Sequence, residues 1–368
     1  MTTTDTTPLA TTSTETVEEF AERLFTAALG AQEAQAAYLG ERLGYYATLA
    51  DGAWLTSGEL AERTSTSERY AREWLEHQAV AHYVEVDDPA APALDRRYHL
   101  PAARAEVLTD ELSPAYVAPL AHITVTLGRS IDELVEAYRT GGGVPWDAHG
   151  DGGRHAQAAA NRPMFLGELG NELLPAIPEI HAALTTGVRV ADIGCGAGWS
   201  SIGIALAYPD VTVDGYDLDE PSIEMARRNA REAGVADRVR FHTADVADLD
   251  LDGSYGAVVA FECIHDMSNP VEVLAAARRL ARPGAPVVVM DENVGDTFSP
   301  DAGPFEQLLY GYSLTCCLPD GMSRTPSAAT GTVIRPATLD AYARGAGFAG
   351  AEALAVSNDS FRFYLLHG

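Results

Sequence analysis

From about residue 181 onward, short apolar runs alternate with longer amphipathic stretches. The apolar runs read "VRVADIG", "VTVDGYD", "VRFHTAD", "YGAVVAFE" and "APVVVMDE". Between them lie stretches of helical length, at Ser200–Tyr208, Pro221–Ala233 and Val271–Ala281. Near-continuous apolar strands that alternate with helices predict a Rossmann-like, doubly wound α/β sheet. The C-terminal segment "AEALAVSNDSFRFYLLHG" predicts two further strands.

The N-terminal part carries a different pattern. Residues 18–50 show helical periodicity, and Thr56 or Ser57 can cap a short helix that ends near Arg63. Ser67 can cap a second helix, after which residues 83–86 and 97–100 alternate as two strands. Two helices followed by a hairpin predict a winged helix.

Between these parts, residues 113–180 are predicted to be helical, with glycine-rich breaks at "GGGVPW" and "GDGG". We therefore divide the chain into four segments. They are a disordered tail over 1–17, a winged-helix-like dimerisation or lid domain over 18–110, a helical connector over 111–180, and the α/β domain over 181–368.

Charge restricts the choice of partner. The 368 residues include 53 acidic and 25 basic ones, a net charge of −28, and every basic residue is Arg. The absence of Lys excludes Schiff-base and P-loop lysine chemistry. Residues 41–110 carry a net charge of −6, with three glutamates on the would-be recognition helix. This balance favours dimerisation over DNA binding and argues against an anionic membrane surface.

Neither a targeting segment nor a membrane span is evident in the sequence. The first 16 residues are Thr-rich and contain no basic residue. No apolar run approaches the ~20 residues that a spanning helix needs. The four cysteines show no zinc or disulfide spacing. We therefore expect a cytoplasmic protein with reduced thiols and no metal.

A glycine-rich turn, "DIGCGAGWS", follows the first strand of the α/β half. Gly194, Gly196 and Gly198 can bring the backbone close to a ligand at the carboxyl edge of the sheet. A dinucleotide fingerprint requires glycine where Trp199 stands, so NAD is disfavoured.

Acidic residues at three strand ends refine the choice of ligand. Asp192 can reach a cationic amino group directly or through water, and Asp217 can accept from both hydroxyls of a ribose. Asp245 can accept from an adenine amino group, with Leu218 and Val246 beside the ring. NAD has no amino acid moiety, whereas S-adenosylmethionine has one, so the pattern indicates S-adenosylmethionine.

The segment Val190–Met267 resembles class I S-adenosylmethionine-dependent methyltransferases. The whole chain is also similar to a bacterial two-domain group with an N-terminal winged helix, related to a mycobacterial methyltransferase family of unassigned substrate. The similar segments are "TSGELAERT", "ERYAREWL", "GGGVPW", "NRPMF", "FECIHDM" and "FRFY". The resemblance implies the fold, the cofactor and a cofactor-binding domain over 181–368, but no acceptor.

The segment "FECIHDM" follows the fourth strand, which faces the sulfonium in this fold. A hydroxyl acceptor must lose a proton, and histidine, with a pKa of about 6.5, can take it. "IHDM" resembles the "HDW" segment of caffeate-type O-methyltransferases, which implies that His265 is the base, although Met267 replaces Trp. Asp266 is predicted to orient His265 or start a helix, and Glu262 to serve the cofactor.

Other residues are candidates for the acceptor side. Glu292, after the fifth strand, is a candidate partner of the acceptor or of the histidine. Cys263, Cys316 and Cys317 could bind a soft metalloid, but their spacing does not match arsenite methyltransferases and favours a pocket-lining role. Tyr310, Tyr312 and Phe165 are aromatic walls or core residues, and the sequence does not separate these readings.

The function predicted is methyl transfer to a small molecule by a homodimer, with O-methylation and a His265 base favoured. N- or C-methylation without an essential base stays open, as does a non-methyl reaction on the same fold. A ligand-responsive winged-helix regulator is the third alternative.

Overall fold

A seven-stranded sheet forms the centre of the C-terminal half, in the order β6-β5-β4-β7-β8-β10-β9. The computed structural model describes residues 15–368. The strands are β4 (Arg189–Ile193), β5 (Thr212–Asp217), β6 (Val239–Thr243), β7 (Ala257–Phe261), β8 (Val287–Glu292), β9 (Gly350–Ala353) and β10 (Phe361–His367). The first five are parallel, whereas β10 runs antiparallel to β8 and β9. The predicted doubly wound α/β sheet is confirmed, with an antiparallel hairpin at one edge.

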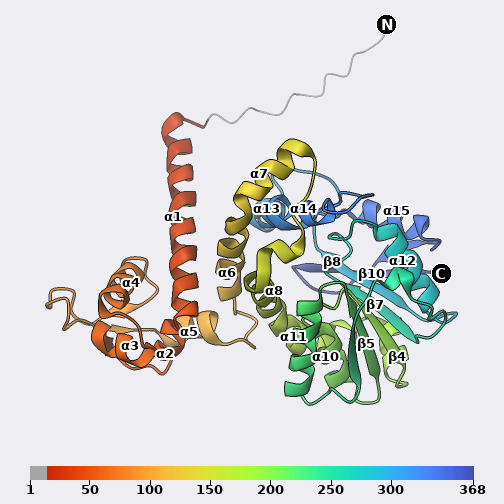
Figure 1. The fold of residues 1–368 in the computed structure, drawn as a ribbon, viewed down its shortest axis with the longest axis horizontal. Coiled ribbons are helices and arrows are strands. Elements are labelled where there is room, and N and C mark those ends of the chain that lie inside the picture. The colour runs from red at the N-terminus through yellow and green to blue at the C-terminus, as the bar shows by residue number, and fades with distance from the viewer. Residues whose placement is uncertain (1–14) are drawn as a thin grey trace, which may run out of the picture.

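Both faces of this sheet are covered by helices (Figure 1). Those that follow the parallel strands and precede β9 are α10 (Trp199–Ala207), α11 (Glu220–Glu232), α12 (Pro270–Leu280) and α15 (Pro336–Gly345). Successive residues of a strand enter opposite cores: Val190 packs in one apolar cluster and Ala191 in the other. Two buried faces explain why the strands read as continuous apolar runs rather than as alternating ones.

The N-terminal part folds as helices around a small three-stranded sheet of order β1-β3-β2. Its elements are α1 (Val17–Arg42), α2 (Tyr45–Leu49), β1 (Leu55–Thr56), α3 (Ser57–Thr64), α4 (Glu68–Val80), β2 (Glu85–Val86), β3 (Arg97–His99) and α5 (Ala102–Thr109). Thr56 caps α3 through a capping box with Glu59, as predicted. Ser67 occupies the N-cap of α4 but makes no capping hydrogen bond. The predicted winged helix is confirmed.

A layer of helices joins the two parts. It contains α6 (Ala118–Leu127), α7 (Ile131–Thr140), α8 (Gly150–Met164), a π-helix (Phe165–Leu173) and α9 (Pro178–Leu184). The predicted break at residues 141–146 is a loop up to Pro145. The break predicted at "GDGG" is confirmed only for Gly150, which has a φ of 59° between a 3₁₀ helix (Trp146–His149) and the rest of α8. A Cβ at Gly152 would lie 3.3 Å from Oγ1 of Thr126 on α6, so this glycine permits close helix packing rather than a turn.

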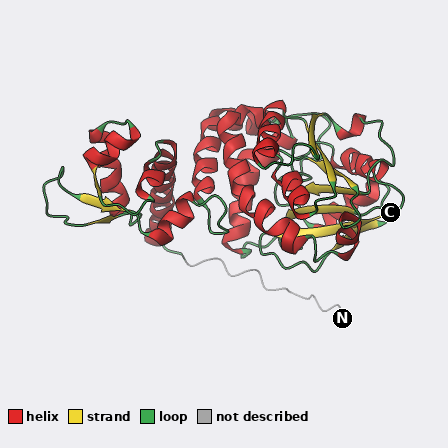
Figure 2. Ribbon diagram, turned by 90° about the horizontal axis from the view of Figure 1, so that it is seen from below, coloured by secondary structure: helices red, strands yellow, loops and turns green. Residues whose placement is uncertain are grey.

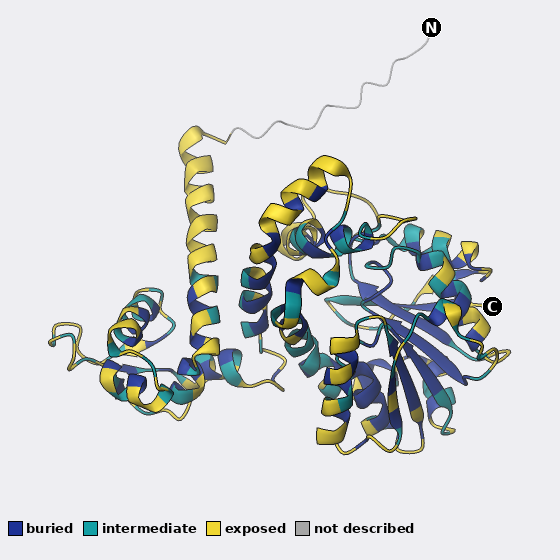
Figure 3. Ribbon diagram, viewed as in Figure 1, coloured by how far each residue is buried: buried dark blue, intermediate teal, exposed yellow. Residues whose placement is uncertain are grey.

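Helix α1 stands between the winged-helix part and the layer of joining helices (Figures 1 and 2), and most of its length is exposed (Figure 3). Thr16 caps it, so the predicted disordered tail over 1–17 ends in ordered residues, and positions 1–14 lie outside the described residues. Within residues 15–368 no helix combines the length and apolarity needed to cross a membrane. The segment boundaries at 110 and 180 stay predictions.

Candidate active site

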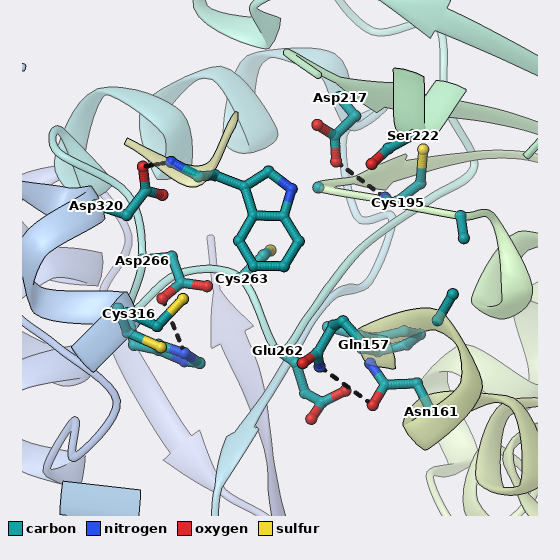
Figure 4. Close-up of a pocket in the computed structure, with 18 of the residues that line it drawn as sticks. Gln157, Asn161, Cys195, Asp217, Ser222, Glu262, Cys263, Asp266, Cys316 and Asp320 are labelled. Atoms are coloured by element: carbon teal, nitrogen blue, oxygen red, sulfur yellow. Dashed lines mark hydrogen bonds and ion pairs between the residues drawn. The ribbon is translucent and has the colours of Figure 1, made fainter. Parts of the chain in front are cut away.

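A cavity of about 1060 Å³ opens at the carboxyl edge of the sheet and is partly covered by the helical layer. Residues from the ends of β4, β5, β7 and β8 line it, together with residues of α6 and α8. On the far side it reaches α13 (Gly303–Tyr312), a second π-helix (Ser313–Cys317) and α14 (Leu318–Gly321). Figure 4 shows Asp217 and Cys195 on one side of this space, and Asp266 and Cys316 on the other. Its volume is at the upper end for ligand sites, which leaves room for a cofactor and an acceptor.

The glycine turn forms one wall. Gly194 and Gly198 have φ of 69° and 82°, in the left-handed region. A Cβ would lie 2.6 Å from Cβ of Cys263 at Gly194, and 2.5 Å from Cζ of Phe241 at Gly198. At Gly196, which lines the cavity, a Cβ would meet nothing within 4 Å. The turn is therefore packed tightly from behind and open toward a ligand.

Asp217, at the end of β5, faces the glycine turn. Its Oδ2 accepts from the backbone N–H of Gly196 at 2.9 Å, and its Oδ1 from that of Asp219 at 2.9 Å. Burial raises the pKa of Asp217, and these two hydrogen bonds act in the opposite direction. Each carboxylate oxygen keeps a lone pair for a ligand hydroxyl. Leu218 is half-exposed and lines the cavity beside it.

Asp245 and Val246 continue this wall from the end of β6. The Asp245 side chain accepts from the N–H of Ala247 at 2.9 Å, and Val246 is buried, and both residues line the cavity. These groups fit S-adenosylmethionine. The open glycine turn leaves room for the ligand beside Gly196, Asp217 suits its ribose, and Asp245 with Val246 suits its adenine.

Asp192 lies differently from the prediction. Its side chain does not line the cavity and is 1% exposed, and its Oδ2 accepts from the hydroxyls of Ser200 and Ser201, both at 2.6 Å. Burial raises its pKa to about 6. Ser200 does line the cavity. Asp192 therefore does not reach the cavity directly, as one of the two expected contacts required, and Ser200 lies between its carboxylate and the cavity.

His265 lies in the loop after β7, with a carboxylate near each ring nitrogen. Its Nδ1 is 2.6 Å from Oδ1 of Asp291 on β8, a side chain with no exposed surface, and its Nε2 is 3.2 Å from Oδ1 of Asp266. Burial lowers the pKa of His265, but the charges of Asp266 and Asp291 together raise it well above the ordinary value. The result is a histidine that is more basic than a free one and that lines the cavity.

The histidine partner was not among the predicted residues. We expected Asp266 or Glu292 to orient the ring, whereas Asp291 holds Nδ1. Among residues 15–368, the Glu292 carboxylate has no hydrogen-bond or ion-pair partner, so its expected pairing with the histidine is corrected. The signal available was a charged residue inside the apolar run "VVVMDE".

Glu262 and Glu292 both line the cavity close to His265. Burial raises the pKa of Glu262 to about 8. It also raises that of Glu292, with the charge of Glu262 adding to the effect. Glu262 adopts a φ of 50°, unusual for a residue other than glycine, and its Oε2 is buried without a partner.

Sulfur and aromatic groups complete the lining. Cys263, Cys316 and Cys317 all face the cavity, and the Cys263 thiol donates to the carbonyl of Ile193 at 3.2 Å. Cys317 lies close to His265 and Asp266: its sulfur, one ring nitrogen and one carboxylate oxygen are all within 4.8 Å of one another. Phe165 and Tyr312 line the cavity, whereas Tyr310 does not and instead accepts from Arg335.

Comparison with known proteins agrees with this geometry. Residues 190–284 match the model of a methyltransferase domain, and residues 31–110 match an Rv2258c-like winged HTH domain. The chain is 39% identical over 109 residues to 27-O-demethylrifamycin SV methyltransferase of Amycolatopsis mediterranei, covering 29% of this chain and 40% of that protein. It is 32% identical over 161 residues to the ubiquinone biosynthesis O-methyltransferase of Pseudomonas aeruginosa, covering 44% and 64%. The chain thus spans less than two thirds of these relatives.

Solved structures match over almost the whole length. The mitomycin 7-O-methyltransferase MmcR has a TM-score of 0.69 at 20% identity, covering 95% of this chain and 98% of that one. Human N-acetylserotonin methyltransferase, solved in complex with SAM, has a TM-score of 0.68 at 18% identity, covering 97% and 99%. These matches establish the shared fold. The chain therefore carries a methyltransferase domain behind a winged-helix domain, which is the arrangement of two-domain class I S-adenosylmethionine-dependent methyltransferases, and its cavity fits the cofactor.

Proposed function

We propose that this protein transfers a methyl group from S-adenosylmethionine to a hydroxyl group of a small molecule, with His265 as general base. The observation that carries the proposal is His265 itself, held at Nδ1 by Asp291 and lining the cavity near the glycine turn. Two relatives that match part of the chain are named 27-O-demethylrifamycin SV methyltransferase and ubiquinone biosynthesis O-methyltransferase, which supports a small-molecule acceptor.

S-adenosylmethionine, when bound, supplies the methyl group on a positively charged sulfur. The residues proposed to hold it are Gly194, Gly196, Gly198, Asp217, Leu218, Asp245, Val246 and Glu262, with Asp192 acting through Ser200. The salt bridge between Arg154 on α8 and Asp219, with N–O distances of 2.6 Å, ties the helical layer to this wall. Covering the cavity in this way keeps water from the reacting atoms.

His265 takes the proton that the acceptor hydroxyl loses as its oxygen attacks the methyl carbon. Nδ1 is occupied by Asp291, so Nε2 is the nitrogen that meets the acceptor. Asp291 fixes the tautomer with the proton on Nδ1 and stabilises the imidazolium that forms. Asp266, whose Oδ1 lies 3.2 Å from Nε2, can accept a second hydroxyl of the acceptor beside that nitrogen.

We further propose that the protein acts as a cytoplasmic homodimer that does not bind nucleic acid. The four cysteines are free thiols, in keeping with a reducing compartment. On α4, the helix in the recognition position, Arg69 and Arg72 pair with Glu73 and Glu68 four residues away. Arginines neutralised in this way are poor ligands for phosphate.

The test is transfer of label from tritiated S-adenosylmethionine into small molecules of a bacterial extract, followed by identification of the product. We expect a methyl ether. A labelled amine or carbon would support the N- or C-methyltransferase alternatives. Cofactor binding without any transfer, across extracts of varied source, would favour a non-methyl reaction on this fold.

A further inference from the structure

The far side of the cavity, between β8 and the helices α13 and α14, carries more acidic groups than its neighbours can neutralise. Eleven acidic side chains line the whole cavity against two arginines. Arg154 is committed to Asp219, on the cofactor wall, and Arg324 is exposed. At the far side, Glu262, Asp266, Glu292 and Asp320 line the space, with His265 as the buried basic residue among them. S-adenosylmethionine has one net positive charge, which leaves an excess of carboxylates there.

Several of these groups are also without hydrogen-bond partners. The Glu292 side chain is 8% exposed, faces the cavity, and has no hydrogen bond or ion pair within the described residues. Oγ1 of Thr332, a residue that is 2% exposed, is buried without a partner, as are the Tyr312 hydroxyl and Oε2 of Glu262. All four side chains line the same cavity. Buried polar atoms in native proteins are normally paired, so these mark where polar groups of a ligand bind.

Tyr312, Glu292 and Glu262 lie close together. The pKa of Tyr312 is raised to about 12 by burial and by the charge of Glu292, which places these side chains near each other. The charge of Glu262 acts in turn on Glu292. An ammonium group offers three donors and a full charge, so it favours the charged form of Glu292, which burial disfavours, whereas a carboxylate on the ligand would face repulsion.

Resting on the proposed function, we infer that the acceptor is a hydroxylated amine, whose ammonium group binds Glu292 while a hydroxyl faces His265. Tyr312 and Thr332 bond further hydroxyls of the same molecule. The ammonium serves as an anchor and stays unmethylated.

The test uses matched trios of amine, neutral and carboxylate ligands on three scaffolds. They are tyramine, ethylphenol and hydroxyphenylpropionate; dopamine, ethylcatechol and dihydrocaffeate; and glucosamine, glucose and glucuronate. Binding to the full-length protein is measured calorimetrically with saturating S-adenosylhomocysteine, and with EDTA so that no metal ion stands in for the amine. We expect the amine to bind roughly tenfold or more tightly than its neutral partner on at least one scaffold, and the carboxylate most weakly.

Glu292→Gln should remove this preference while leaving affinity for S-adenosylhomocysteine unchanged, which also reports that the variant is folded. Glu224→Gln, an exposed glutamate on α11, makes the same charge change away from the cavity and should keep the preference. Equal or tighter binding of the neutral or carboxylate members, or no binding of any amine at millimolar concentration, would overturn the inference.

The inference and the proposed function fail in different ways. O-methylation of neutral or acidic acceptors would overturn the amine while leaving the function intact. Amine binding that depends on Glu292, with the methyl group delivered to nitrogen, would support the subsite and overturn O-methylation.

Discussion

His265 is the residue on which the proposed chemistry depends most directly. If it accepts the acceptor's proton, His265→Ala should lower turnover by roughly 10²–10⁴, the usual contribution of a positioned base. Affinity for S-adenosylmethionine should be unchanged, because the glycine turn and Asp217 do not contact the ring in the structure. Single-turnover kinetics and calorimetry on the same preparation measure the two quantities. Turnover within a few fold of wild type would remove His265 from the catalytic residues.

Asp291 should set the pH dependence of that base. Only the neutral ring accepts a proton, so turnover should rise with pH through the pKa of His265, which the neighbouring carboxylates raise. Asp291→Asn removes one of these charges, lowers the pKa and should move the inflection to lower pH, with a lower maximal rate. A pH profile of kcat for both proteins measures this shift. An unshifted inflection would mean that another group titrates.

Asp217 carries the corresponding prediction for the cofactor. Asp217→Ala should weaken S-adenosylhomocysteine binding about tenfold or more, since hydrogen bonds to a charged group contribute about 1.5–3 kcal/mol. The matched control is Asp210→Ala, an exposed residue ahead of β5. Calorimetry checks both variants, and equal affinities would show that Asp217 does not hold the ribose.

At the scale of elements, the loop over residues 141–145, which follows α7, is hydrogen-bonded and tightly packed against α14. The N–H of Val144 donates to the carbonyl of Pro319 at 3.0 Å, and that of Trp146 to the Asp320 side chain at 2.8 Å. A Cβ at Gly143 would lie 2.3 Å from the Pro319 oxygen and 2.3 Å from the Ser323 nitrogen. Both are backbone atoms, so neither can move aside cheaply. The loop therefore holds one edge of the acceptor side in place.

Gly143→Ala should consequently lower the free energy of unfolding by about 1–3 kcal/mol, the range for overpacking. Its neighbour offers a control: a Cβ at Gly142 would lie 3.4 Å from Oγ1 of Thr140, an ordinary contact. Denaturant unfolding of the two variants should separate them clearly. Equal stability would show that the loop can retreat from α14 without cost.

For the whole molecule, the exposed helix α1 indicates self-association. Phe20, Leu24, Phe25 and Leu29 are 46–68% exposed on it, although large side chains of this kind are normally buried. We predict a dimer of the full chain by light scattering, and a monomer for the double variant Leu24→Glu and Phe25→Glu. The control is the double variant Glu22→Ala and Arg23→Ala, which changes two exposed polar positions next to them on α1 and should stay a dimer. A wild-type monomer, or salt-sensitive binding to random duplex DNA, would contradict the proposed role of the N-terminal domain.

What the sequence by itself determined depends on whether a feature arises from neighbouring residues or from segments far apart along the chain. The strands, the glycine turn and the aspartates at strand ends depend on local pattern, because a parallel strand must be apolar on both faces and a backbone close to a ligand must lack side chains. These features were readable without a structure, and so was the winged helix. The role of Gly152 was not, because only the neighbouring helix α6 shows that it is a packing residue.

The tertiary structure alone decided the partners of the polar side chains. Phe261 pairs with Met290 across β7 and β8, and this register brings Asp291 to the loop that carries His265. Neighbouring residues of a strand point to opposite sides, so Asp291 and Glu292 take different roles, one on the ring and one in the cavity. No sequence pattern specifies that register or that choice. The hydroxyls that bind Asp192 were hidden for the same reason, since the packing of α10 against β4 brings them to it.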